Sequence, residues 1–461
     1  MSIIFIMRQL LHLLIFNPRC CTALAAWHDA RWLLPVVSCP ERTRAGPVAL
    51  RWTEDLGVSG DVIGQWAGRI APDGRAVDWM VIVTARSEQR PAAAAALRWS
   101  SFESLTSAPP LLDYQEWAVR RIAASGRPHV TGPFGVHTWL DEVRAWIANV
   151  ARMPPVDSVA TYRTTATEVV LGCSMAPHQL YFKGLASDRA SEALFTSRLA
   201  TVAPESFART VALERRRDES VWWLTDACPG LSFARCPSIE GARCVAAACA
   251  ELQRRTMTSG DVCDLPNANL SKAAASIAEL VDDRFDNARS CRTAIEEACD
   301  RVVRAGLTQA WIPLDLDPEN VLVDAGGAVR FIDLDDSHVG PAPLAIATFA
   351  RRLERMAVGA SASPELADVV RRGYERTWPE SVAGCDWRAL DIAAAVLEAD
   401  LGWKRVIKNI ERGELAGPID LVRGRIAQRL TRATAPRSDP SVKTAPQQVG
   451  AALGNPTVER R

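Results

Sequence analysis

The stretch of residues 311–341 constrains the fold more than any other part of this 461-residue chain. Its sequence, WIPLDLDPENVLVDAGGAVRFIDLDDSHVGP, holds two acidic clusters, each beside an apolar run. Residues 321–323 and 328–332 are typical of short strands, and residues 324–327 supply a tight turn with two glycines between them. We therefore expect a β-hairpin in the middle of this stretch.

A hairpin brings the residues before its first strand close to the residues after its second. Asp315 and Asn320 precede the first predicted strand and Asp333 follows the second, so we expect these three side chains to converge. Two carboxylates and an amide offer hard oxygen ligands, which suit Mg²⁺ when phosphate oxygens complete its shell.

Two blocks of this stretch carry a family resemblance. Residues 313–322 read PLDLDPENVL, and residues 332–335 read IDLD. They resemble the catalytic core of the aminoglycoside phosphotransferase family, a branch of the protein-kinase-like fold. That family usually reads HGDLHPxNVL, then a hairpin, then Ile-Asp-Phe/Trp-Asp/Glu. The chain departs from this pattern at both histidine positions, where it has Pro313 and Asp317.

The resemblance implies an ATP- and Mg²⁺-dependent phosphotransferase that moves the γ-phosphate to a hydroxyl group of a small molecule. By the matched positions, Asp315 is the catalytic carboxylate that accepts the hydroxyl proton. Asn320 and Asp333 are the implied Mg²⁺ ligands, and Asp335 is a secondary metal candidate. Because both histidines are replaced, the alternative is a pseudokinase, a nucleotide-binding or regulatory module without turnover.

The residues before this stretch have the order of a kinase-like N-lobe. Lys183 lies near the end of a predicted strand, and Glu192 follows nine residues later in a predicted helix. As the resemblance implies, we expect these two residues to form an ion pair that directs the lysine toward the α- and β-phosphates of ATP. The strand and helix patterns of this lobe cover residues 158–163, 168–173, 179–185, 187–202, 205–214 and 221–225.

Two loops complete the predicted nucleotide site. Residues 226–230 are the candidate hinge between lobes, where backbone groups of Ala227 and Cys228 would bind adenine. Residues 164–167 are rich in Thr and lack the glycine pattern of a phosphate loop, so this loop alone predicts nothing.

These patterns predict an α+β chain with a bilobal protein-kinase-like fold, preceded by a small α+β domain. The β-rich N-lobe is expected at residues 154–228 and the larger helical C-lobe at residues 229–432. Apolar residues at helical spacing support the C-lobe, and the segments concerned are residues 242–254, 270–285, 286–305, 342–356, 364–377, 386–412 and 418–431. Residues 433–461 are polar and Pro-rich, and we expect them to be disordered.

The N-terminal part carries weaker signals. Residues 1–30 are interpreted as a ragged N-terminus, and residues 31–153 as an α+β domain of unknown role. This domain lacks the Glu-rich metal-binding helix of Nudix proteins, so a structural or regulatory role is expected. Its predicted strands are residues 32–37, 47–52 and 79–84, and its predicted helices are residues 114–124 and 139–151.

The charge balance and the cysteine pattern limit the classes of binding partner that we expect. Lys plus Arg and Asp plus Glu both number 54, so net charge gives no attraction to nucleic acid or a membrane surface. The twelve Cys have no CxxC pair, and we expect free thiols in a reducing cytoplasm. The expected partner is a small-molecule hydroxyl substrate. Acidic residues on the helices after residue 341 could attract a cationic acceptor, although acids on helices usually face water.

Overall fold

The structure is a computed structural model. It describes residues 8–17, 21–28, 31–40, 45–70, 76–86, 97–107, 115, 118–120, 134, 139–152, 158–165, 167–175, 178–259, 265–281, 288–334, 336–358, 365–384, 386–411 and 419–435.

The N-terminal part is built on a seven-stranded mixed sheet in the order β3-β2-β1-β6-β5, with β4 paired to β1 and β7 paired to β2. The two long strands β1 and β6 run parallel, and their apolar residues are buried on both faces of the sheet. The elements are β1 (Arg8–Asn17), β2 (Thr22–His28), β3 (Arg31–Leu33), β4 (Val36–Cys39), α1 (Ala45–Asp55), β5 (Gly60–Ile70), β6 (Ala76–Ala85), β7 (Leu97–Ser101) and α2 (Phe102–Ser107).

Two predictions for this part are wrong. Residues 1–30 are not ragged where the structure describes them, because β1 and β2 occupy central positions in the sheet and Leu13 and Ile15 are fully buried. Residues 47–52 lie in helix α1 rather than in a strand. Pro47 sits in the first turn of this helix, where its fixed φ is compatible and no N–H is needed, and the buried positions Ala45, Ala49 and Thr53 recur at helical spacing.

The predicted N-lobe is confirmed as a five-stranded antiparallel sheet in the order β11-β12-β10-β9-β8. The strand predicted at residues 205–214 is shorter than expected, because Pro204–Ser206 forms a 3-10 turn and the strand begins at Thr210. The elements are β8 (Ser158–Thr164), β9 (Glu168–Met175), β10 (His178–Leu185), α5 (Ala190–Val202), β11 (Thr210–Arg215) and β12 (Val221–Asp226).

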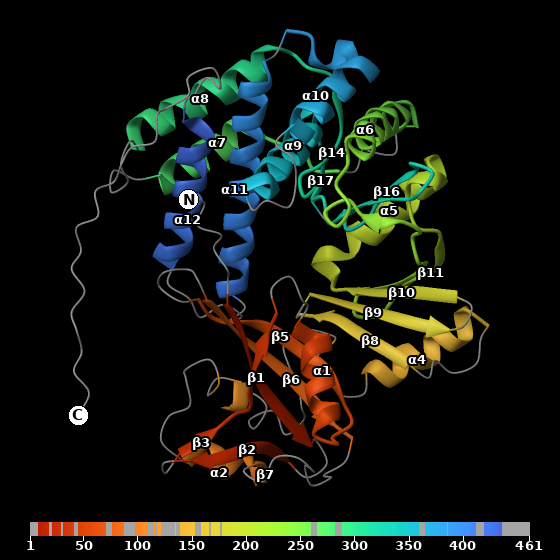
Figure 1. Cartoon of the computed structure of the whole chain (residues 1–461), viewed down its shortest axis with the longest axis vertical. Coiled ribbons are helices and arrows are strands. Elements are labelled where there is room, and N and C mark those ends of the chain that lie inside the picture. The colour runs from red at the N-terminus through yellow and green to blue at the C-terminus, as the bar shows by residue number, and fades with distance from the viewer. Residues whose placement is uncertain are drawn as a thin grey trace.

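Helix α4 (Trp139–Val150) packs on this sheet, although the sequence analysis placed it in the preceding domain. It covers the face of β8–β10 that points away from the helical lobe (Figure 1). Trp146 makes edge-to-face contacts with Phe182 and Trp222, and its Nε1–H donates a 2.6 Å hydrogen bond to Glu214 Oε2. The N-lobe therefore includes α4.

Replacing Trp146 by Ala is expected to lower the free energy of unfolding by about 3 kcal/mol, because it removes the ring that fills the core between α4 and the sheet. Trp146→Phe keeps much of the ring and loses the bond to Glu214, so it should cost about 1 kcal/mol. Urea-induced unfolding measures both changes. An unchanged Trp146→Ala midpoint would show that α4 is not part of the N-lobe core.

Helix α1 packs directly against the outer strand β8 of the N-lobe. A Cβ atom added at Gly46 would lie 2.8 Å from the carbonyl oxygen of Thr161, so the two backbones leave no room for a side chain. Figure 1 shows α1 between the N-terminal strands and β8. The N-terminal sheet and the N-lobe are therefore in close contact through this helix.

The C-lobe is helical, and every helix predicted for it is present. One hydrophobic core joins these helices to the catalytic stretch. No helix in the described part of the chain is long and apolar enough to cross a membrane. The helices are α6 (Ile239–Ser259), α7 (Leu270–Leu280), α8 (Ala288–Arg304), α9 (Pro343–Val358), α10 (Glu365–Thr377), α11 (Trp387–Glu411) and α12 (Ile419–Thr434).

Residues 309–341 form two small antiparallel ladders inside this lobe. The predicted hairpin is confirmed as β15 (Val321–Val323) with β16 (Val329–Phe331), and β13 (Leu231–Ser232) pairs with its outer side. β14 (Gln309–Pro313) and β17 (Ser337–Pro341) pair with each other and close the stretch at both ends.

A buried hydrogen-bond network holds these ends in place. The side-chain amide of Gln253 on α6 donates to the carbonyl oxygens of Trp311 at 2.7 Å and Ala342 at 2.9 Å. The hydroxyl of Tyr374 on α10 donates to Gln253 Oε1 at 2.7 Å. Strand β14 and the residue before α9 are thus fixed to one point of the core.

Candidate active site

Lys183 on β10 brings together groups from three distant parts of the chain. Its Nζ lies 2.5 Å from Glu192 Oε1 on α5, 2.6 Å from Asp333 Oδ1 after the hairpin, and 3.2 Å from Glu168 Oε1 on β9. Strand alternation explains its direction, because Phe182 points into the core under α4 and Lys183 therefore points to the opposite face. The structure thus places the predicted Lys183–Glu192 pair beside Asp333.

The charges in this cluster keep one another ionised. Burial alone would lower the pKa of Lys183, but Glu192, Asp333 and Glu168 outweigh it and raise that pKa well above its ordinary value. Lys183 in turn holds the pKa of Asp333 well below its usual range. Asp333 is therefore a carboxylate at any physiological pH.

Glu168 is a member of this cluster that the sequence analysis did not single out. It is 1% exposed, and its Oε2 lies 2.7 Å from Arg189 and 3.2 Å from Arg163. Burial alone would raise the pKa of Glu168, but Lys183, Arg163 and Arg189 lower it. The signal in the sequence was an acid at the start of an otherwise apolar strand, which requires a cationic partner when the strand is buried.

Asp315 and Asn320 lie on the loop between β14 and β15. The loop is held by backbone bonds from Asp317 N to the Asp315 oxygen at 2.7 Å and from Asn320 N to the Asp317 oxygen at 2.8 Å. The side-chain amide of Asn320 also donates to the backbone oxygen of Asp315 at 3.3 Å. A further bond, from Ile332 N to the Asn320 oxygen at 3.0 Å, places this loop beside the residue that precedes Asp333.

The donor set here is suited to Mg²⁺. Asp333 supplies an ionised carboxylate, and Asn320, which uses its NH₂ group to bond Asp315, keeps its amide oxygen as an acceptor. Among the described residues, no three His, Cys, Asp or Glu side chains cluster as a metal site by themselves. Asp335, the secondary candidate, lies outside the described residues.

Asp333 adopts an unusual backbone conformation. Its φ is +59°, in the left-handed region that non-glycine residues rarely occupy. Such strain persists where surrounding contacts enforce it, and here the ion pair with Lys183 and the hairpin on its N-terminal side both do so. The strain fixes the direction of the carboxylate.

The carboxylate of Asp315 is bound by an arginine that the sequence analysis missed. Arg352 on α9 contacts Asp315 Oδ1 at 2.6 Å, Asp317 Oδ2 at 2.8 Å and Glu398 Oε1 on α11 at 2.8 Å. Asp317 stands where the resembled family has a histidine, and an acid at that position calls for a cation. The replacement of a motif histidine by Asp317 was therefore the sign in the sequence that this loop needs a basic partner, which the structure supplies as Arg352.

The residues of the predicted hinge and of the threonine loop make the following contacts. The Ala227 N–H donates to the Gln179 oxygen at 2.9 Å, and burial raises the pKa of the Cys228 thiol to about 11. In the loop, the Thr165 hydroxyl accepts hydrogen bonds from the N–H groups of Thr167 at 3.3 Å and Glu168 at 3.1 Å. These two amides are used within the loop itself.

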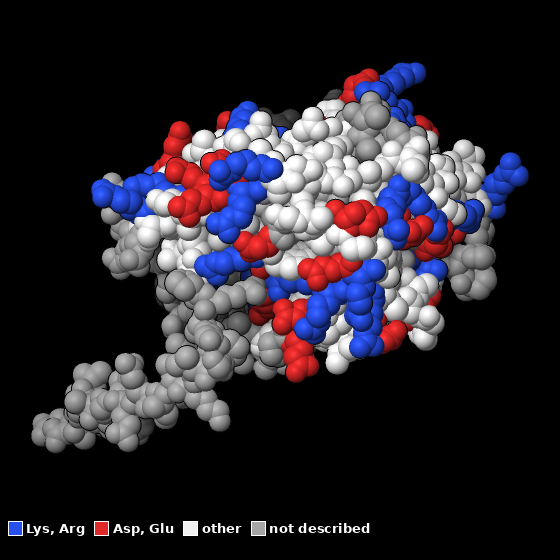
Figure 2. Space-filling model, turned by 90° about the horizontal axis from the view of Figure 1, so that it is seen from above, with Lys and Arg blue, Asp and Glu red and all other residues white. Residues whose placement is uncertain are grey.

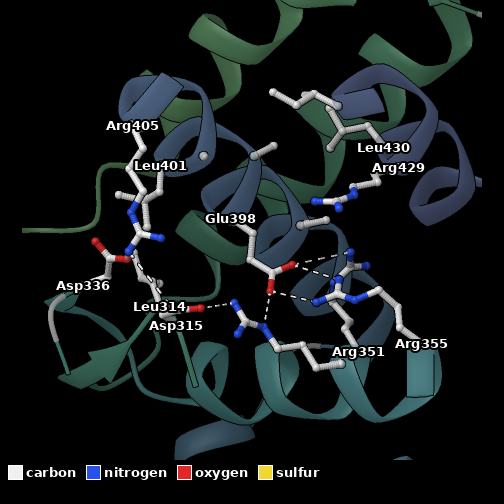
Figure 3. Close-up of a pocket in the computed structure, with 15 residues that line it drawn as sticks. Leu314, Asp315, Asp336, Arg351, Arg355, Glu398, Leu401, Arg405, Arg429 and Leu430 are labelled. Carbon is white, nitrogen blue, oxygen red and sulfur yellow. Dashed lines mark hydrogen bonds and ion pairs between the residues drawn. The ribbon is translucent and has the colours of Figure 1, made fainter. Parts of the chain in front are cut away.

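A cavity of about 220 Å³ opens beside Asp315, between the catalytic loop and helices α9, α11 and α12 (Figure 3). Of its fifteen lining residues, five are arginines and three are Asp or Glu.

No protein-family model matches the chain, and no curated protein matches it. Among solved structures, an aminoglycoside-3'-phosphotransferase of type VIII is 22% identical, with 55% of this chain and 98% of that chain covered and a TM-score of 0.39. The chain is similar to small-molecule kinases. A choline kinase from Streptococcus pneumoniae is 14% identical, with 64% of this chain and 98% of that chain covered and a TM-score of 0.47. A spectinomycin phosphotransferase in complex with ADP and spectinomycin is 10% identical, with 63% of this chain and 98% of that chain covered and a TM-score of 0.44.

The predicted fold class is confirmed: a β-rich N-lobe precedes a helical C-lobe, with a further mixed sheet at the N-terminus.

Proposed function

We propose that the chain is a phosphotransferase that moves the γ-phosphate of ATP, with Mg²⁺, to a hydroxyl group of a small molecule in the cytoplasm. The observation that carries this proposal is the contact of Lys183 with both Glu192 and Asp333. A strand lysine, a helix glutamate and the acid after the catalytic hairpin are the parts that hold phosphates and metal in kinase-like phosphoryl transfer.

Each residue of the cluster has a distinct task in this proposal. Lys183 neutralises the α- and β-phosphates, and Glu192 and Glu168 keep its ammonium group in position. Asn320 and Asp333 would hold Mg²⁺, which when bound neutralises the phosphate charge. The carbonyl of Ala227 and the N–H of Cys228 would bind the base.

Asp315 acts on the acceptor. It orients the hydroxyl and takes its proton while the oxygen forms a bond to the γ-phosphorus and the bond from that phosphorus to the ADP oxygen breaks. Arg352 holds this carboxylate, so Arg352 is a positioning residue.

A pseudokinase remains the second candidate, and the pairing of Asp315 with Arg352 is the observation that favours it. A guanidinium 2.6 Å from the carboxylate competes with a substrate hydroxyl for the same oxygen. A thermal-shift titration with MgATP, followed by ADP formation with a panel of alcohols, separates the two functions. A shift without ADP formation would identify the pseudokinase.

Replacing Asp333 by Asn should weaken MgATP binding at least about tenfold, because the variant loses the negative charge that holds the metal and Lys183. Asp324→Asn, in the turn of the same hairpin, is the matched control and should leave MgATP binding unchanged. Titration calorimetry with ATP, with and without Mg²⁺, measures the effect. Equal affinities in the two variants would remove Asp333 from the metal site.

A further inference from the structure

The cavity beside Asp315 is unusually rich in arginine. Arg351, Arg352 and Arg355 come from α9, Arg405 comes from α11, and Arg429 comes from α12. Opposite them stand three carboxylates, so the lining carries a formal excess of two positive charges. Figure 2 shows acids and bases interspersed over the face of the helical lobe that it presents.

Every carboxylate of the lining already has an arginine partner. Asp315 pairs with Arg352, and Asp336 pairs with Arg405. Glu398 is contacted by Arg352 at 2.8 Å and, at longer distances, by the other two arginines of α9. A cationic acceptor would therefore have to displace a guanidinium from an acid before it could bind.

The arginines of α9, in contrast, have donors to spare. Each guanidinium carries five N–H donors, whereas Glu398 is shared among three of them. Arg351 Nε is buried and has no hydrogen-bond partner among the described residues, and Arg351 Nη2 is 3.9 Å from Glu398 Oε2. In Figure 3 the guanidinium groups of Arg351, Arg355 and Arg429 gather on one side of Glu398, while Asp315 lies on the other.

We propose that this cavity is the acceptor site and that the acceptor carries an anionic oxyacid group, a carboxylate or a phosphate, bound by Arg351, Arg355 and Arg429. The proposal rests on the phosphotransferase function above and assigns its substrate class. Planar guanidinium groups bind both oxyacids through paired N–H donors. With the anion held there, the hydroxyl of the same molecule points toward Asp315 at the other end of the cavity.

Binding of a probe to the cavity is measured as a rise in the unfolding midpoint of the whole chain at constant ionic strength. The probes share one carbon skeleton: D-glycerate carries a carboxylate, glycerol 3-phosphate carries a phosphate, and glycerol carries neither. Choline is the cationic probe. At least one anion should raise the midpoint, and glycerol and choline should not. Comparison of the two anions shows which oxyacid the site takes.

Arg429→Ala should weaken anion binding about tenfold, because one charge-assisted contact is lost. Arg432→Ala is the matched control, since Arg432 lies one turn further along α12, is exposed and does not line the cavity. Its affinity should equal that of the unaltered chain. Equal weakening in both variants, stabilisation by choline alone, or no response to either anion would overturn the proposal.

ADP formation separates this inference from the proposed function. Turnover with anionic alcohols, reduced in Arg429→Ala, supports both. Turnover with choline or an aminoglycoside and not with anionic alcohols keeps the phosphotransferase and overturns the anionic acceptor. Anion binding that Arg429→Ala weakens, without ADP formation from any acceptor, keeps the anion site and overturns the phosphotransferase.

Discussion

Replacing Asp315 by Asn is expected to lower kcat for phosphoryl transfer by about 10²–10⁴-fold, the range that a positioned general base contributes. The amide has nearly the shape of the carboxylate, but it cannot take the hydroxyl proton. MgATP affinity should stay unchanged, because the contacts of Lys183 with Glu192 and Asp333 do not involve Asp315. Coupled ADP assays and calorimetry measure the two quantities.

The matched control lies in the same loop. Glu319 is exposed, and Glu319→Gln makes the same acid-to-amide change four residues away. It should retain full turnover. If Asp315→Asn keeps activity within a factor of about three of this control, Asp315 is not the base.

Replacing Lys183 by Met is expected to lower the free energy of unfolding by about 3–5 kcal/mol at neutral pH, as removal of one partner from a buried ion pair does. Its side chain is 13% exposed, and the variant leaves Glu168, Glu192 and Asp333 facing one another without it. MgATP binding should be lost as well. Arg243→Met, which breaks an exposed pair with Glu240 on α6, should cost at most about 1 kcal/mol.

The pH dependence of this loss has a definite sign. In the unaltered chain the pKa values of Asp333 and Glu168 are lowered, so their contribution to stability is present above the unfolded pKa of about 4 and is lost as pH falls. Without Lys183 the clustered carboxyls have raised pKa values, and protonation relieves their repulsion. The difference between the two unfolding curves should therefore shrink on acidification. A difference that stays constant from about pH 7 to about pH 4 would contradict the charge argument.

Local sequence signals predicted the parts of the site that lie close together in the chain or on regular elements. The hairpin followed from two apolar runs around Gly326 and Gly327, and the structure has it at the expected residues. The Lys183–Glu192 pair followed from the family resemblance, supported by a predicted strand, a predicted helix and a spacing of nine residues.

The contacts that the sequence could not supply join residues far apart in the chain. Arg352 reaches Asp315 across 37 positions and Arg405 reaches Asp336 across 69, and neither arginine differs in context from an ordinary helix-surface residue. Helix α4 was assigned to the wrong domain for a similar reason, because its apolar stripe shows that it packs and does not show on what. Only the tertiary structure pairs such surfaces.

The close packing of α1 on β8 at Gly46 has a mechanical consequence. In the phosphotransferase proposed above, closure of the two lobes around nucleotide would rotate them about residues 226–230. Since α1 fits against β8 without space for a methyl group, the N-terminal sheet must travel with the N-lobe as one body. A molecule bound to the N-terminal sheet would then change the lobe closure of the proposed phosphotransferase.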